Sequence, residues 1–228
     1  AASLQLGGPE RKLAFSVPTG NFGDVFAGHV AARMGLPIAQ LVVATNVNDI
    51  LHRALSAGDY SAGTVTPTAA PSMDIQISSN FERLLFDVGG RDGAALAEQM
   101  RGFESTRAMQ LTNAQREGAA RLFTSLRADE HDMASAMRWA CEDCAQVIDP
   151  HTAIGLHAAR AVELPVGVPV VTLATAHPAK FPDAVERATG TRPSLPPRVG
   201  DLFAREEAYT ELAGTYEAVR DHIVGHAA

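Results

Sequence analysis

A glycine-containing loop near the start of the chain has the residue types that bind anions. Thr19-Gly20-Asn21-Phe22-Gly23 follows the apolar run 13–17 and comes directly before a helical pattern that begins at Asp24. Glycines let a backbone approach a ligand closely, and the free amides at a helix start favour negative charge. The loop therefore indicates a phosphate site, although two glycines in a tight strand-to-helix turn give the same pattern.

The spacing within this loop disfavours two common nucleotide sites. A Walker loop needs Gly-Lys-Ser/Thr, and no lysine lies in this segment. A dinucleotide fingerprint needs G-x-G-x-x-G and an acidic residue after the second strand, but here the glycines are spaced G-x-x-G and the strand ends in Thr45-Asn46. A phosphate compound other than a nucleotide fits better.

Few lysine and histidine side chains are candidates to act at the site. Lys12 and Lys180 are the only lysines among 19 basic residues. Lys180 lies in the sequence HPAKF, where an exposed or salt-bridged state is the commoner one for a lysine. His177 in the same motif is interpreted more simply as a hydrogen-bonding residue that holds its loop than as a general base.

Cys141 and Cys144 form a lone CxxC motif inside a helical pattern. A structural zinc site needs four ligands, and a thioredoxin-type pair stands at the start of a helix that follows a strand. We therefore expect two thiols on or near a helix surface, and no metal site. Trp139 shares this helical stretch with Met133 and Met137 and is predicted to be core.

The elements that position these residues alternate helical patterns with a few apolar strands. We expect buried strands at 13–17, 41–45 and 168–175. Helices are predicted at 24–33, 48–58, 81–87, 93–103, 113–127, 130–147, 151–161 and 206–224. The first strands and helix form a βαβ unit, and 61–80 is a long loop of small residues. We predict an α/β open sheet with helices on both faces, undivided by any linker.

Composition narrows the class of protein. The 228 residues are 46% hydrophobic and carry a formal net charge of −7, which argues against a nucleic-acid surface. The longest apolar runs are too short to span a membrane, and two cysteines do not make a disulfide framework. We expect a soluble, cytoplasmic protein that binds neither nucleic acid nor membrane.

Five stretches of the chain resemble the threonine synthase family. In order, they read SVPTGNFGDVFAGHVA, LVVATNVNDILHRAL, PSMDIQISSNFERLLFD, DPHTAIG and LATAHPAKFPDAV. The resemblance spans nearly the whole chain and implies the carboxy-terminal part of a fold type II, tryptophan-synthase-β-like enzyme that uses pyridoxal 5′-phosphate. It implies a carbon–oxygen lyase that converts O-phospho-L-homoserine and water to L-threonine and phosphate, the last step of threonine biosynthesis.

The same resemblance assigns residues to a cofactor site. It surrounds the cofactor phosphate with the loop residues Gly20, Asn21, Phe22, Gly23 and Asp24. It also makes Thr175 the hydroxyl partner of the pyridine nitrogen, which is one of the few ways a protein tunes this cofactor. A carboxylate at Asp24 is compatible with a nearby anion if it caps helix amides or orders the loop.

The covalent lysine is absent from the matching stretches. Family members carry the Schiff-base lysine ahead of the glycine loop, so we expect it upstream of residue 1. Residues 1–228 are then expected to be incomplete and inactive alone, with the upstream half as a partner. Lys180, His177 and Arg83 are candidates to line the site or hold the substrate phosphate. Val47 and Ala70 stand where the family is expected to be more polar, which leaves substrate details open.

Two alternatives stay open. The chain is a non-catalytic fragment or threonine synthase-like protein that binds phosphate or pyridoxal phosphate, or it belongs to another fold type II enzyme such as a dehydratase. Reconstitution with an upstream half tests the first alternative, and substrate specificity tests the second. An incomplete sheet also predicts exposed apolar surface on this chain.

Overall fold

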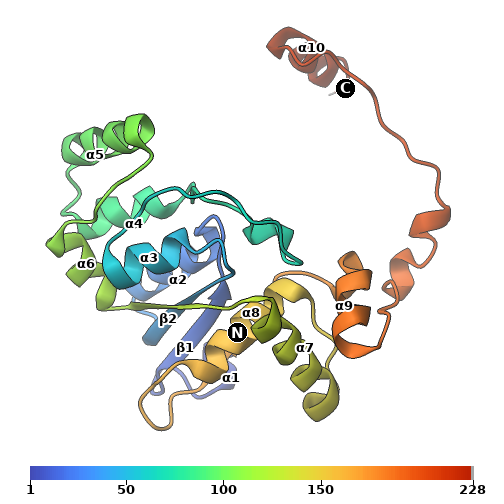
Figure 1. Ribbon diagram of the computed structural model, residues 1–228, viewed down its shortest axis with the longest axis horizontal. Coiled ribbons are helices and arrows are strands. Elements are labelled where there is room, and N and C mark those ends of the chain that lie inside the picture. The colour runs from blue at the N-terminus through green and yellow to red at the C-terminus, as the bar shows by residue number, and fades with distance from the viewer. Residues whose placement is uncertain (227–228) are drawn as a thin grey trace. The chain divides into compact units, whose positions relative to one another are not determined.

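The computed structural model describes residues 1–226, and residues 1–193 contain a four-stranded parallel sheet, of which Figure 1 labels β1 and β2. The strands are β1 (Leu13–Pro18), β2 (Ile38–Thr45), β3 (Phe123–Arg127) and β4 (Val170–Thr172). They lie in the order β3-β2-β1-β4. A helix joins the neighbouring parallel strands β1 and β2, which confirms the predicted βαβ unit.

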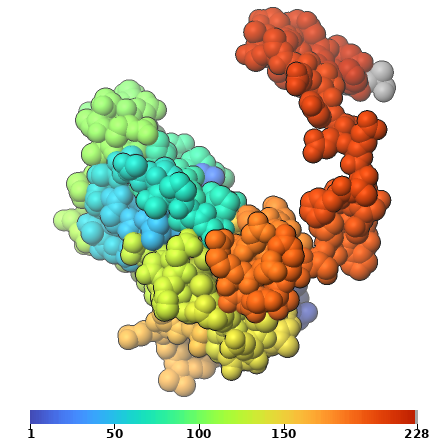
Figure 2. Space-filling model, turned by 45° about the vertical axis from the view of Figure 1, so that its right-hand side comes forward, coloured from blue at the N-terminus to red at the C-terminus, as the bar shows by residue number. Residues whose placement is uncertain are grey.

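Helices make up about half of the remaining described residues. They are α1 (Ala2–Gln5), α2 (Gly23–Arg33), α3 (Ile50–Ala57), α4 (Phe81–Val88), α5 (Gly93–Thr106), α6 (Asn113–Ala120), α7 (Glu130–Cys144), α8 (Pro150–Ala161), α9 (Pro182–Thr189) and α10 (Tyr216–His226). Short 3-10 turns are η1 (Pro71–Met73), η2 (Pro178–Lys180), η3 (Pro197–Val199) and η4 (Leu202–Ala204). Figure 2 shows α5, in green, projecting from the elements around the sheet.

Helices cover both faces of the sheet, as predicted, because the side chains of β2 alternate between two apolar cores. Leu41 and Val43 belong to one core, which also contains residues of α2, α3 and α4. Val42 and Ala44 belong to the other, with residues of α7, α8 and α9. The carboxyl end of the sheet therefore lies between two packed helical layers.

The prediction of one helix over 113–127 is wrong in its second half. The helix α6 ends at Ala120, and β3 pairs with β2 so that Leu41 lies opposite Phe123. The Leu41 amide donates to the Leu122 carbonyl at 2.8 Å. A short apolar run is ambiguous between helix and strand, and here an unpaired edge of β2 decides the outcome.

The residues after Pro193 form a second compact unit, Ser194–Ala228, whereas Ala1–Pro193 forms the first. Composition did not predict this boundary. The helix predicted over 206–224 is wrong for its first part, because residues 206–215 are not helical and α10 begins at Tyr216. The strand predicted at 168–175 is also shorter, since β4 contains only Val170–Thr172.

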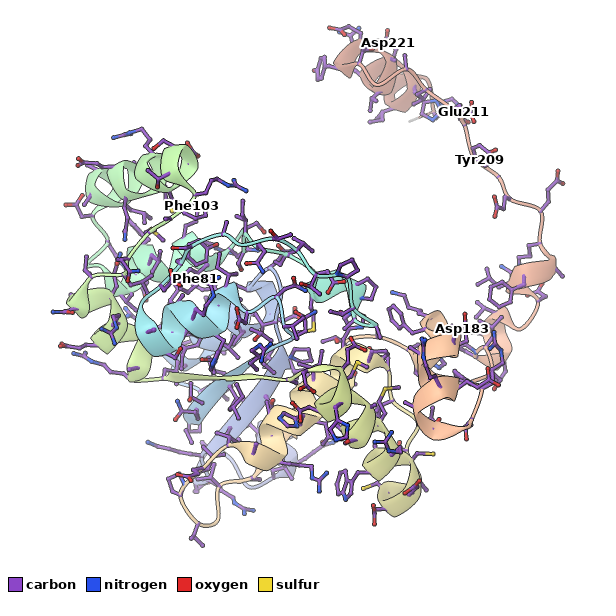
Figure 3. The ribbon with its side chains drawn as sticks, viewed as in Figure 1. Phe81, Phe103, Asp183, Tyr209, Glu211 and Asp221 are labelled. Carbon is purple, nitrogen blue, oxygen red and sulfur yellow. The ribbon has the colours of Figure 1, made fainter. Side chains whose placement is uncertain are left out.

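Tyr60 anchors the long loop 61–80 to the first core. Its ring lies 5.1 Å from the ring centroid of Phe81 and 5.0 Å from that of Phe103, the two residues labelled on α4 and α5 in Figure 3. Its hydroxyl accepts the Ser78 amide at 2.8 Å, and burial raises the pKa of Tyr60. The far end of the loop is thereby held beside the start of α4.

We expect Gly155→Ala to destabilise the first unit by about 1–3 kcal/mol, because it overpacks a tight helix–sheet contact. A Cβ at Gly155 would lie 2.9 Å from Pro18 Cγ and 3.2 Å from Thr172 Cγ2, and the proline ring cannot swing away. Urea unfolding measures the change. In the control Gly102→Ala, on α5, a Cβ meets nothing within 4 Å and stability should rise slightly. Equal stability of the two variants would contradict the prediction.

Candidate functional site

The glycine loop lies at the carboxyl end of β1, the edge at which open parallel sheets bind ligands. The Thr19 amide donates to the Ala44 carbonyl at 2.8 Å, which joins the loop to the end of β2. Phe22 has a left-handed backbone with φ of 66°. Its buried ring packs 5.2 Å from Phe81 and 5.6 Å from Phe123, so core packing offsets the backbone strain.

The amides at the start of α2 are left available. Phe22 is the N-cap of this helix, and its side chain offers no hydrogen-bond acceptor. Among residues 1–226, the backbone N–H groups of residues 20–25 donate to no protein acceptor. Asp24 lies exposed in the first helical turn and does not cap these amides. The cluster of donors therefore suits an anion from outside the described residues.

Residues 78–80 brace the loop from one side. The Ser78 hydroxyl donates to the Gly20 carbonyl at 2.8 Å, and the Asn80 side chain donates to the Asn21 carbonyl at 2.9 Å. On another side, a Cβ at Gly20 would come within 3.0 Å of the Ser72 carbonyl oxygen. A side chain at this position would therefore crowd the Ser72 backbone, and the long loop 61–80 packs closely against the glycine loop.

A partly buried polar network holds the long loop against the end of β2. The Asp74 carboxylate accepts hydrogen bonds from the side-chain amides of Asn46 at 2.7 Å and Asn48 at 3.0 Å. It also accepts the Thr68 amide and the Thr68 hydroxyl, both at 2.7 Å. Ala70, which stands where a polar residue was expected, is fully buried in the second core. The sequence alone does not indicate that these two segments bond to each other.

A buried carboxylate at the start of α8 was also missed. Asp149 is 0% exposed and accepts the His151 amide at 2.9 Å, the His151 ring Nδ1 at 2.9 Å and the Thr152 hydroxyl. Burial opposes its ionisation, but these hydrogen bonds outweigh burial and hold the pKa of Asp149 below its ordinary value. The sequence signal is DPHT, an Asp before a Pro at the first helical position, which is typical of an N-cap.

Thr175, His177 and Lys180 lie together in the segment that follows β4. The Thr175 amide donates to the Thr152 hydroxyl oxygen at 3.3 Å, and the Thr175 hydroxyl has no partner among the described residues. The His177 ring Nδ1 accepts the Ala179 amide at 3.1 Å and caps η2, which agrees with the loop-holding role predicted for it. Lys180 is exposed on this turn.

Arg83 belongs to a different feature, a groove between α2, α4 and α5 with a cavity volume of about 750 Å³. Its guanidinium lies 4.4 Å from the ring centroid of Phe26. Met34 is 83% exposed and Phe86 is 38% exposed along this groove, in agreement with the exposed apolar surface expected. The structure therefore does not group Arg83 with His177 and Lys180.

Two helix-surface predictions have different outcomes. Cys141 is half-buried and Cys144 is exposed, and both are free thiols as interpreted from the sequence. Trp139 is only half-buried, because its ring faces the Arg160 guanidinium at 4.0 Å from the ring centroid, so its prediction as core was wrong.

Within residues 1–226, no group of three His, Cys, Asp or Glu residues is arranged for a metal ion. Over the same range, no helix has the length and apolar character needed to cross a membrane.

Comparisons with known proteins agree with these features. A family model described as threonine synthase, C-terminal, matches residues 152–223. Threonine synthase of Pseudomonas aeruginosa is 48% identical over 226 residues, which cover 99% of this chain and 48% of that protein.

Solved structures show the same relationship. The structure of PLP-bound threonine synthase from Brucella melitensis is 46% identical with a TM-score of 0.92, and the match covers 99% of this chain and 48% of that one. Threonine synthase from yeast is 33% identical with a TM-score of 0.83, over 90% of this chain and 46% of that one. The chain thus spans about half the length of the relatives it matches, and it belongs to the threonine synthase family.

Proposed function

We propose that this chain forms the carboxy-terminal, cofactor-binding portion of a threonine synthase. The proposed reaction converts O-phospho-L-homoserine and water to L-threonine and phosphate. The observation that carries the proposal is the glycine loop, whose amides at residues 20–25 find no acceptor among the described residues at the carboxyl end of β1. The name of the Brucella melitensis relative, which states that it is PLP-bound, supplies the class of anion.

The residues present fit pyridoxal 5′-phosphate. The backbone N–H groups from Gly20 to Asp24 would hold its phosphate, and the close packing of Gly20 against Ser72 keeps that cradle narrow. The neutral hydroxyl of Thr175, which lacks a partner in the described part of the chain, would face the pyridine nitrogen. When bound, the cofactor supplies an electron sink for negative charge that develops on substrate carbon. Lys180 and His177 remain our candidates for the substrate phosphate.

The Schiff-base lysine is proposed to come from the half of the enzyme that this chain does not match. The matched relatives are about twice as long as the chain. The apolar groove between α2, α4 and α5 is the surface we assign to that half, because its exposed side chains include Met34 and Phe86. We also propose a cytoplasmic location, which the two free thiols on α7 support.

The experiment that tests the function combines binding with turnover. Calorimetric titration measures the affinity of this chain for pyridoxal phosphate, and phosphate release from O-phospho-L-homoserine measures activity. Release is expected only after the amino-terminal portion of the Pseudomonas aeruginosa relative is added. Cofactor binding without release would favour a non-catalytic binder, and release from another amino acid would favour a dehydratase. Activity of this chain alone would contradict the assignment of the lysine.

We expect Phe86→Glu to weaken reconstitution with that amino-terminal portion at least about fivefold, because it places a charge in an apolar contact. The measurement is the concentration of the added portion that gives half-maximal phosphate release. Affinity for pyridoxal phosphate should not change, since Phe86 lies outside the glycine loop. Val166→Glu is the matched control, because Val166 is fully exposed outside the groove. An equal effect of both variants would remove the groove from the interface.

A further inference from the structure

The buried Asp149 carboxylate stands at the branch point of two hydrogen-bonded arms. One of its oxygens accepts from His151 at 2.9 Å, through both the ring Nδ1 and the backbone amide. The other oxygen accepts the Thr152 hydroxyl. Because Asp149 is 0% exposed and ionised, each of these donors is held in one direction.

The first arm leads to the glycine loop. Because the Nδ1–H of His151 donates a hydrogen bond to Asp149, the ring presents Nε2 as an acceptor, and the Ser72 amide donates to it at 3.2 Å. Ser72 belongs to η1, and its carbonyl oxygen is the atom that a Cβ at Gly20 would approach to 3.0 Å. His151 therefore holds the Ser72 backbone, against which the glycine loop packs.

The second arm leads to the segment after β4. The Thr152 hydroxyl donates its hydrogen bond to Asp149, so only its lone pairs remain for other partners. The Thr175 amide donates to one of them at 3.3 Å. This bond holds the backbone of Thr175 and therefore the point from which its hydroxyl extends; that hydroxyl has no partner among residues 1–226.

We propose that Asp149 is a positioning residue that places both ends of the cofactor site. Through His151 and Ser72 it sets the phosphate cradle at Gly20, and through Thr152 it sets the group that meets the pyridine ring at Thr175. This role rests on the proposed cofactor function. The geometry connects two segments that are distant in sequence, one at Ser72 and one at Thr175, to one side chain.

Amide hydrogen exchange tests the two arms without any cofactor. Asp149→Asn should raise the exchange rates of both the Ser72 and the Thr175 amides roughly tenfold or more. His151→Phe should affect Ser72 alone, and Thr152→Val should affect Thr175 alone. Thr152→Ser restores the hydroxyl and should restore protection at Thr175. The single-arm variants keep the test decisive if Asp149→Asn fails to fold.

Affinity measurements then test the same two arms, with inorganic phosphate and pyridoxal phosphate as probes. His151→Phe should weaken both probes about tenfold, because both need the phosphate cradle. Thr152→Val should weaken pyridoxal phosphate while leaving inorganic phosphate unchanged. Asp143→Asn and Thr64→Val, both at exposed positions, are the matched controls and should change neither affinity.

The outcomes separate the inference from the function on which it rests. Asp149→Asn, His151→Phe and Thr152→Val could all lose affinity for both probes to the same degree, without the arm-specific exchange pattern. That result would make Asp149 a general stabilising residue and would overturn the inference. If the unchanged chain binds neither probe, the proposed cofactor function fails. The exchange pattern at Ser72 and Thr175 would still decide whether Asp149 holds both segments.

Discussion

Gly20→Val is expected to lower the affinity of the chain for pyridoxal phosphate more than about a hundredfold. Its Cβ would meet the Ser72 carbonyl oxygen at 3.0 Å, and a backbone atom cannot rotate away as a side chain can. The loop must then shift, and its amides lose their convergence. Two hydrogen bonds to a charged group contribute roughly 3–6 kcal/mol together, which corresponds to this loss.

Calorimetric titration with pyridoxal phosphate and with inorganic phosphate measures the effect of Gly20→Val. Both ligands should lose affinity, because the substitution acts on the phosphate end of the site. Gly102→Val is the matched control, since a Cβ there meets no atom within 4 Å and α5 lies outside the site. Wild-type affinity in Gly20→Val would show that the loop does not bind the phosphate.

Asp149→Ala should lower the free energy of unfolding of the first unit by about 3–5 kcal/mol, because several buried donors lose their acceptor. The change leaves the His151 ring, its amide and the Thr152 hydroxyl without their common acceptor in a buried site. A loss of this size is a large part of the roughly 5–15 kcal/mol that stabilises a typical domain. Denaturant unfolding measures it, and a loss below about 1 kcal/mol would mean that water or relaxation replaces the lost bonds.

The same carboxylate predicts a pH dependence with a definite sign. The pKa of Asp149 is lowered in the folded chain, despite burial, by hydrogen bonds from His151 and Thr152. Its contribution to stability is therefore complete above the unfolded value of about 3.9 and is lost as pH falls through the folded pKa. The difference in unfolding free energy between wild type and Asp149→Asn should shrink as pH falls below about 4. A difference that stays constant through this pH range would contradict the prediction.

Local patterns in the sequence predicted the parts of the fold that depend on near neighbours. The glycine loop stands between β1 and α2 because an apolar run, two glycines and a helical pattern follow one another within about 20 residues. The two-sided sheet also followed from local pattern, since fully apolar runs such as 41–44 supply side chains to both faces. These features need no knowledge of distant contacts.

Where a local pattern was ambiguous, pairing with a distant segment decided the structure. Residues 123–127 were predicted as the end of a helix, but they form β3 because β2 offers an edge with unpaired backbone groups. Residues 206–215 continue a helical pattern but are not helical in the second unit. Neither outcome could be read from periodicity alone.

The sequence by itself determined the family, the glycine loop and the two-sided parallel sheet, because motifs and hydrophobic patterning are local properties of a chain. Only the tertiary structure decided which polar groups share a buried site. Asp149 meets His151 and Thr152 within one helix turn, but their links to Ser72 and Thr175 exist only once α8 packs between η1 and the end of β4. Buried polar groups require partners, and folding, not sequence distance, selects them.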